Sequence, residues 1–168
     1  MIFVTVGTHE QPFNRLVKAV DDLKADGTIP ADEPVFIQTG FSTYEPQHCE
    51  WAKLLPYEDM QSYIQEARIV ITHGGPSSFL APLQLGKIPI VMPRHVEYGE
   101  HVNNHQMEFA KDVAKRFDNI IVVDDKTELA AAIADYDHFI INKTDVALSN
   151  NWEFCKSFVA IVNELLLK

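Results

Sequence analysis

The chain has 168 residues, of which 46% are hydrophobic, and its formal net charge is −10 at pH 7. This length predicts a single domain over residues 1–168, with enough apolar residues to fill a core. The acidic balance argues against a nucleic-acid backbone or an anionic lipid surface as the partner. The chain has two cysteines, no apolar run of about 18 residues and no basic segment before its first apolar run. We therefore expect a cytoplasmic protein without a signal peptide.

Apolar runs alternate with segments of helical periodicity in the first half of the chain. Strands are expected at residues 2–6, 34–38 and 69–72, with a further short strand near residues 53–55. Helices are expected at residues 12–24 and 58–66, because their apolar residues recur at helical spacing.

The second half of the chain repeats this alternation. The expected strands are 88–92 and 120–123, the expected helices are 102–116, 126–135 and 152–167, and 139–149 is expected to be a loop or a frayed segment. We expect the last helix to pack on the sheet, and the alternative is that its excess apolar surface docks a membrane-bound partner. Strands that alternate with helices in this way predict an α/β fold, in which a parallel sheet carries helices on both faces.

A glycine turn follows the expected strand at residues 69–72. Its residues are His73, Gly74, Gly75, Pro76, Ser77 and Ser78. The glycines permit a close approach to a ligand, the proline suits the first turn of a helix, and either serine can cap that helix. A helix N-terminus is a favourable place for an anion such as a phosphate. Any strand-to-helix turn can contain Gly and Ser, so the turn alone leaves an anion site and an ordinary turn both open.

Three loops leave the predicted sheet at the same edge. They follow Val6, Thr72 and Met92. Ligands of parallel α/β sheets bind beyond the carboxyl ends of the strands, so a ligand is expected at this edge. Because the chain is acidic, local dipoles and a few basic residues would have to hold a polyanionic ligand there.

Three stretches carry a resemblance to a known family. They read FVTVGTHEQPFNRLVKAV at the start, ITHGGPSSFLAPLQLGKIPIVMPR in the middle and YGEHVNNHQMEFAK after it. Together they resemble the glycosyltransferase family 28 C-terminal domain over about residues 1–116, and in particular the small bacterial capsule and exopolysaccharide proteins that carry this domain alone. The chain is also similar to the soluble subunit of the split eukaryotic transferase that adds the second N-acetylglucosamine in N-glycan assembly.

The resemblance implies a Rossmann-like fold and the donor-binding half of a GT-B glycosyltransferase. Such a half binds a nucleotide sugar, usually a UDP-sugar, without a metal or another cofactor. It further implies an inverting hexosyltransferase subunit that acts on a lipid-linked oligosaccharide in capsule or exopolysaccharide biosynthesis. The acceptor half is expected in a membrane-associated partner, which would hold this chain at the inner face of the cell membrane. Without that partner the chain is expected to be inactive or weak, and to form a homodimer as one option.

Residue by residue, the resemblance implies a donor site made of three loops. Gly7 and Thr8 match a glycine loop near the diphosphate, and the turn from His73 to Ser78 matches the segment that faces the nucleotide. Arg94 is the best candidate for a fixed cation at this edge. The third loop would contact the donor sugar or its phosphates through Glu100, His101, Asn104, His105 and Gln106.

Each of these assignments has a simpler alternative. His9 is the one candidate in this chain for the catalytic base, but the base is expected rather in the partner, and an exposed loop histidine is an equal alternative. Arg94 could instead form a surface salt bridge, and the two asparagines at 103 and 104 could merely cap a helix. His101 and His105 have the spacing of a helical zinc site, but no third ligand is evident, so no metal is expected.

One position departs from the family pattern. Many relatives carry an acidic residue five positions before the glycine that ends the helix, where it binds the ribose hydroxyls, and Ala81 occupies this position here. The alternative function is therefore a non-catalytic activator that stabilises or enhances a partner glycosyltransferase. A dinucleotide-binding dehydrogenase fits the α/β pattern, but GxGxxG is missing after the first strand. The sequence leaves the acceptor open, and galactose, glucose and N-acetylglucosamine all fit as the transferred sugar.

Overall fold

The computed structural model describes residues 1–141 and 151–166. Its centre is one six-stranded sheet in the order β3-β2-β1-β4-β5-β6, in which all paired strands are parallel. The strands are β1 (Ile2–Thr5), β2 (Val35–Gln38), β3 (Glu50–Ala52), β4 (Ile69–His73), β5 (Ile90–Met92) and β6 (Ile121–Val122). This arrangement confirms the predicted α/β class.

Seven α-helices and one 3-10 helix accompany the strands in the described residues. They are α1 (Asn14–Ala25), α2 (Tyr57–Glu66), α3 (Pro76–Gln84), η1 (Val96–Tyr98), α4 (His105–Phe117), α5 (Lys126–Ala134), α6 (Tyr136–Ile141) and α7 (Asn151–Leu166). Helix α6 occupies the start of the predicted loop at 139–149, and the rest of that loop lies outside the described residues, as does the predicted last residue of the final helix, 167.

Two predicted elements begin three residues away from the expected position. The short strand lies at Glu50–Ala52 rather than near residues 53–55, and Leu55 packs instead against the apolar cluster under α2. Helix α4 begins at His105, three residues later than predicted. The side chain of Asn103 accepts a hydrogen bond from the backbone N–H of His105, which closes a turn before the helix.

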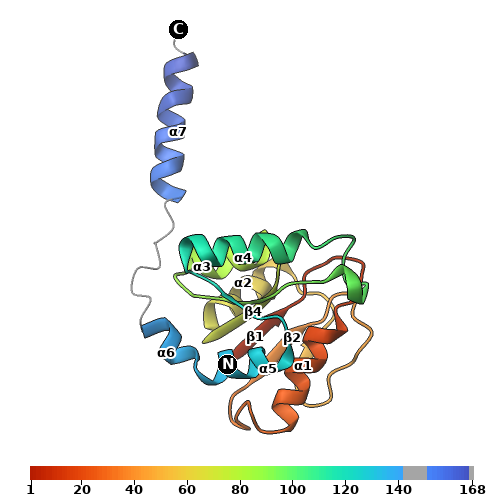
Figure 1. Ribbon diagram of the computed structural model, residues 1–168. Helices are drawn as coiled ribbons and strands as arrows, with labels where there is room; N and C mark the ends of the chain where they lie inside the picture. The colour runs from red at the N-terminus through yellow and green to blue at the C-terminus, as the bar shows by residue number, and fades with distance from the viewer. Residues whose placement is uncertain (142–150, 167–168) are drawn as a thin grey trace.

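Helices cover both faces of the sheet. Figure 1 shows α2, α3 and α4 on one face and α1 with α5 on the other. The strand residues alternate accordingly, since Ile2 and Val4 of β1 belong to the cluster with α1 and α5, whereas Phe3 belongs to the cluster with α2. All three side chains are fully buried.

The strand order creates a switch point in the middle of the sheet. Strands β1 and β4 are neighbours, but β1 is followed along the chain by β2 on one side and β4 by β5 on the other. The connections therefore diverge and leave a crevice beyond the carboxyl ends of these two strands, which is where open parallel sheets bind ligands. The loops after β1, β4 and β5 all emerge at this edge, as predicted.

Helix α7 differs from the other helices in its surroundings. It was expected to pack on the sheet, and this prediction is wrong: in Figure 1 the helix stands apart from the sheet and its covering helices. Its large apolar side chains are exposed, namely Phe154, Phe158, Val159, Ile161, Leu165 and Leu166. Among the helices of the described residues, none combines the length and the apolar character needed to cross a membrane.

Candidate functional site

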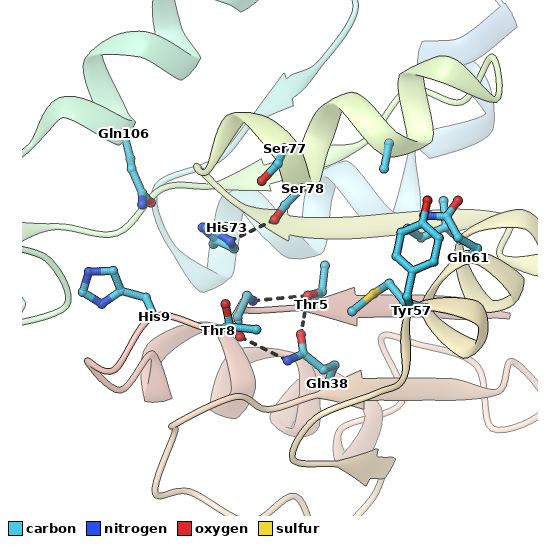
Figure 2. Close-up of a pocket in the computed structure, with 14 residues that line it drawn as sticks. Thr5, Thr8, His9, Gln38, Tyr57, Gln61, His73, Ser77, Ser78 and Gln106 are labelled. Carbon is cyan, nitrogen blue, oxygen red and sulfur yellow. Dashed lines mark hydrogen bonds between the residues drawn. The ribbon is translucent and has the colours of Figure 1, made fainter.

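A pocket of about 470 Å³ opens at the carboxyl ends of β1 and β4 (Figure 2). This volume lies in the range of small-molecule sites. Its wall consists of Thr5, Gly7, Thr8, His9, Gln38, Tyr57, Met60, Gln61, Ile64, His73, Ser77, Ser78, Ala81 and Gln106. None of these lining residues is Lys, Arg, Asp or Glu, so an anion in this pocket would meet neutral hydrogen-bond donors and backbone dipoles.

The structure brings part of the predicted site together on this wall. The predicted residues that line it are Gly7, Thr8, His9, His73, Ser77, Ser78 and Gln106. The predicted residues that do not line it are Gly74, Gly75, Pro76, Arg94, Glu100, His101, Asn104 and His105. The first loop and the glycine turn thus meet one residue of the third loop.

His73 occupies the centre of the wall at the end of β4. Its Nδ1 lies 3.0 Å from the backbone nitrogen of Gly75, and its Nε2 lies 3.0 Å from the hydroxyl oxygen of Ser78. A Cβ atom at Gly7 or at Gly75 would overlap the imidazole ring, so this histidine explains both glycines. Burial, together with the nearby charge of Arg94, lowers the pKa of His73 to about 4, and the ring is therefore neutral at pH 7.

The start of α3 differs in detail from the prediction. Pro76 is the first helical residue, as expected, but the N-cap is Gly75 and no side chain caps the helix, so neither Ser77 nor Ser78 has the predicted capping role. Both serines instead line the pocket. Their hydroxyl groups lie beside a helix N-terminus, whose dipole favours negative charge.

Arg94 is completely buried and lies behind the pocket. Its guanidinium donates to the carbonyl oxygens of Gln11 at 2.8 Å, Glu100 at 3.0 Å and Val6 at 2.9 Å, and it packs over the ring of Phe13. Burial lowers the pKa of Arg94 to about 10, which leaves it charged at neutral pH. Arg94 therefore does not line the pocket as the predicted fixed cation, and it does not form the alternative surface salt bridge, because its donors face the interior.

Glu100 is also buried and also serves the loops behind the pocket. Both of its carboxylate oxygens accept hydrogen bonds from Arg15, at 3.0 and 2.9 Å, and one accepts the backbone N–H of His95. Arg15 donates in addition to the carbonyl oxygens of Pro93 and Asp124. Glu100 thus fastens the loop after β5 to α1, and its carboxylate does not face the pocket.

The two asparagines before α4 have separate roles. The Asn104 side chain accepts the backbone N–H of Val96 at 2.9 Å and donates to Glu97 at 3.2 Å, so it orders the loop around η1. Asn104 is the N-cap residue of α4 but no side chain caps this helix, and Asn103, one residue earlier, accepts the N–H of His105. The His105 side chain is exposed outside the pocket.

His9 lies at one end of the pocket, with its ring 5.0 Å from that of His101. Its Nδ1 accepts the backbone N–H of Gln11 at 3.2 Å, so the neutral ring carries its proton on Nε2. Burial, followed by the charges of Arg94 and His101, lowers the pKa of His9. The remaining ring nitrogen is thus a donor, and this arrangement does not favour the predicted role of His9 as a base.

Six of the fourteen residues of the pocket wall were not singled out in the sequence, namely Thr5, Gln38, Tyr57, Met60, Gln61 and Ile64. Thr5 donates to Gln38, and the Gln38 amide donates to the carbonyl of Gly7 at 3.1 Å, so the floor of the pocket is tied to the first loop. A polar residue at the end of a buried strand was the available signal for Gln38. For Met60 and Ile64 of α2 no signal existed, because helical spacing marks them as core residues. Within residues 1–141 and 151–166, no three His, Cys, Asp or Glu side chains gather as a metal site would require.

One protein family matches this chain, and solved glycosyltransferase structures have a similar fold. The family described as "Glycosyltransferase family 28 C-terminal domain" matches residues 1–150. A solved structure described as the "Glycotransferase of kitacinnamycin" is similar at 16% identity and a TM-score of 0.56, over 88% of this chain and 35% of that chain. The glycosyltransferase SnogD from Streptomyces nogalater is similar at 15% identity and a TM-score of 0.57, over 95% of this chain and 43% of that chain. This chain thus spans less than half the length of either structure, and a search of curated proteins gave no match.

Proposed function

The chain belongs to the glycosyltransferase family 28 C-terminal domain family, and from this premise we propose that it is the donor-binding subunit of an inverting, UDP-sugar-dependent hexosyltransferase. The observation that carries the proposal is the pocket at the switch point of the sheet. Its wall combines a helix N-terminus, two serine hydroxyls and a buried glutamine, and it contains no charged side chain. These groups suit a ligand that has both an anionic part and a hydroxyl-rich part.

The diphosphate is assigned to the end of the pocket at α3. There Ser77 and Ser78 offer hydroxyl donors next to the positive end of the helix dipole. Transfer of the sugar expels a nucleoside diphosphate, and fixed donors stabilise the charge that develops on this leaving group. A chain with a net charge of −10 can supply this stabilisation without a lysine or an arginine in the pocket.

The sugar is assigned to the region around Gln106. This side chain is 9% exposed, and its Oε1 atom has no hydrogen-bond partner of ordinary geometry in the described part of the chain, although the side chain lies close enough to His73 to oppose the lowering of the pKa of that imidazole. An amide can donate to one sugar hydroxyl and accept from another. Galactose, glucose and N-acetylglucosamine remain the candidates for the transferred sugar.

The acceptor site is assigned to a membrane-associated partner that presents a lipid-linked oligosaccharide in capsule or exopolysaccharide biosynthesis. This chain spans 35% and 43% of the two similar transferase structures. More than half of each of those transferases therefore lies outside the region that this chain matches, and a partner could supply the corresponding part. The hydrogen bond that His9 Nδ1 accepts supports a catalytic base outside this chain. Through the partner, this subunit would lie at the inner face of the cell membrane.

Helix α7 is proposed as the docking element for that partner, because its apolar side chains have no cover in the described structure. The variants Phe158→Glu and Leu165→Glu change two exposed residues that are two helical turns apart. We expect both variants to remain soluble and to lose capture of the partner chain in a pull-down. Asn163→Glu adds the same charge to the same helix and should retain capture. An insoluble Phe158→Glu variant would instead indicate that this face belongs to the core.

Titration calorimetry of the purified chain tests the donor-binding role. The ligands are UDP, UDP-glucose, UDP-galactose, UDP-N-acetylglucosamine and, for the dehydrogenase alternative, NADH. We expect binding of one UDP-sugar, weakened by Ser77→Ala and by Gln106→Ala but not by Ser62→Ala, which lies outside the pocket. Saturable binding of NADH without binding of any UDP-sugar would contradict the proposal.

A second candidate function is a non-catalytic activator of the partner transferase. The observation that favours it is Ala81, which lines the pocket at the position where many relatives carry a ribose-binding carboxylate. An activator would raise the activity of the partner while every UDP-sugar titration stayed silent, both with and without the partner. Binding of one UDP-sugar in the same titrations would exclude it.

A further inference from the structure

The tautomer of His73 follows from its contact with the glycine turn. Figure 2 shows the imidazole at the centre of the pocket wall, facing Ser78. Its Nδ1 lies 3.0 Å from the backbone nitrogen of Gly75, whose N–H group can only donate. Nδ1 is therefore the acceptor and carries no proton. A neutral imidazole has one N–H group, so this proton is on Nε2.

The direction of the next hydrogen bond follows from this tautomer. Nε2 lies 3.0 Å from the hydroxyl oxygen of Ser78, and because Nε2 carries the proton, His73 donates and Ser78 accepts. The hydroxyl proton of Ser78 then has to point away from the imidazole. Ser78 lines the pocket, so this proton is available to a ligand there. The serine thus presents a donor to the pocket.

The ring is held in this orientation by its surroundings. His73 is buried, and a Cβ at either Gly7 or Gly75 would overlap the ring, so both glycines lie directly against it. A second proton on Nδ1 would face the N–H of Gly75 and lose that hydrogen bond. Burial, with the charge of Arg94, also lowers the pKa of His73 to about 4, in agreement with a neutral ring at pH 7.

We propose that His73 is a positioning residue that fixes the hydroxyl of Ser78 as a hydrogen-bond donor to a diphosphate oxygen of the bound nucleotide. The inference rests on the proposed function, which assigns the diphosphate to this end of the pocket. His73 acts through Ser78 and holds the anion by no charge of its own. This explains how an uncharged wall can present an oriented donor to an anion.

Two substitutions at His73 separate the two hydrogen bonds of the ring. His73→Asn keeps an acceptor for Gly75 but is too short to reach Ser78, whereas His73→Gln can place an amide N–H near the position of Nε2. In UDP titrations we expect His73→Asn to weaken binding about 10- to 100-fold, the range for one hydrogen bond to a charged group. We expect His73→Gln to recover most of this loss. His48→Asn changes an exposed histidine outside the pocket and should bind UDP as the wild type does.

A double-mutant cycle tests whether His73 acts through Ser78. Ser78→Ala should weaken UDP binding as much as His73→Asn does, and His73→Asn should add nothing further in the Ser78→Ala background. Binding of uridine, which has no phosphate, should be the same in all these variants. Nitrogen NMR of the free protein should show His73 protonated on Nε2 alone between about pH 6 and 8.

Three results would overturn the inference while the proposed function stands. They are wild-type UDP binding by His73→Asn, a full additional loss when His73→Asn is combined with Ser78→Ala, and a ring protonated on Nδ1 in the free protein. A wild-type chain that binds no UDP, with or without its partner, would overturn the inference and the proposed donor-binding function together.

Discussion

Two groups of side chains lie next to each other at the carboxyl edge of the sheet, and they are built in opposite ways. The buried ion cluster consists of Arg94 and Glu100, which are buried, and of the half-buried Arg15. These charged residues bind one another or the backbone of the surrounding loops, and Nε of Arg94 is their one buried side-chain nitrogen or oxygen without a partner in the described residues. The pocket wall is uncharged, and it retains groups without a partner in the described residues, such as Oε1 of Gln106.

This contrast indicates a division between folding and binding. A buried charge is costly unless other groups form hydrogen bonds with it, so a charged group close to the core is used by the fold. A neutral polar group costs less free energy than a charged one when it has no partner, so it can remain open for a hydrogen bond to a ligand. Substitutions in the buried ion cluster should therefore change stability, and substitutions on the pocket wall should change affinity.

The largest expected effect is that of Arg94→Met. The substitution would leave the buried carbonyl groups of Val6, Gln11 and Glu100 without their donor. Each unsatisfied buried group costs about 1 to 3 kcal/mol, so we expect the free energy of unfolding to fall by about 4 kcal/mol. Urea unfolding followed by circular dichroism measures this change.

Arg116→Met is the matched control for this prediction, because Arg116 is exposed on α4. It should change the free energy of unfolding by about 0.5 kcal/mol or less. The prediction would be contradicted if Arg94→Met kept its stability and lost UDP binding. Arg94 would then be a ligand-binding cation, and the distinction between the buried ion cluster and the pocket wall would no longer hold.

Asp21 of α1 extends the comparison to a buried charge outside this cluster. Its carboxylate is 1% exposed and accepts hydrogen bonds from the hydroxyl of Tyr44 and from the backbone N–H groups of Gln47 and His48. Burial alone would raise the pKa of Asp21, but these hydrogen bonds outweigh it and hold the pKa below its ordinary value. A lowered pKa stabilises the fold above about pH 4, and the stabilisation is lost as the pH falls through the native pKa.

Asp21→Asn should therefore lower the free energy of unfolding by about 2 kcal/mol at neutral pH, because the amide cannot accept from all three donors. The difference from the wild type should shrink as the pH falls below about 4, and urea unfolding at both pH values measures it. Asp22→Asn, on the surface of the same helix, should have an effect of about 0.5 kcal/mol. A deficit in Asp21→Asn that did not change with pH would point to packing rather than to charge.

Gly75→Ala tests the contact between the glycine turn and His73. The backbone of Gly75 has φ −73° and ψ 127°, which any residue can adopt, so the expected cost arises from overlap of the new Cβ with the imidazole. We expect a loss of about 1.5 kcal/mol, which should largely vanish when the ring is removed by His73→Ala in the same chain. Thermal and urea unfolding of the two single variants and the double variant measure this coupling.

Gly99→Ala provides the comparison for that experiment. Gly99 has φ +69°, and a Cβ there would meet no other atom. Its substitution should cost about 1 kcal/mol through the backbone alone, and His73→Ala should not change this cost. An equal cost of Gly75→Ala with and without His73 would show that the imidazole does not determine the need for this glycine.

Much of the fold could be predicted from the sequence, because strands and helices differ in the period of their apolar residues. The run at β4 and the spacing in α1 place both elements to within a few residues. The α7 prediction failed because apolar periodicity indicates that a helix buries one face and does not indicate what it is buried against. Leu165 and Phe158 have the pattern of core residues but are exposed in the described structure.

The candidate site could be predicted only in part, for a related reason. The glycine turn and Gln106 were found because a motif and a resemblance marked them, and both reach the pocket wall. Arg94 carries the residue type of an anion site, but the sequence contains no sign that three carbonyl groups from two loops would surround it. Gln38 was missed because its contacts with Thr5 and Gly7 form only when β1 and β2 pair.

The smallest expected change in stability, and the clearest change in binding, belongs to Gln106→Ala. The lost side chain is buried but its Oε1 has no partner in the described residues, so the free energy of unfolding should fall by about 1 kcal/mol or less. If Gln106 contacts the sugar, affinity for the preferred UDP-sugar should fall about 10-fold while affinity for UDP stays unchanged. Gln65→Ala, on the exposed side of α2, should alter neither affinity. Equal weakening of UDP and UDP-sugar binding would assign Gln106 to the nucleotide end of the pocket. Weaker binding of the UDP-sugar alone would be the opposite result to that expected for Arg94→Met, because Gln106→Ala would lose affinity and keep stability.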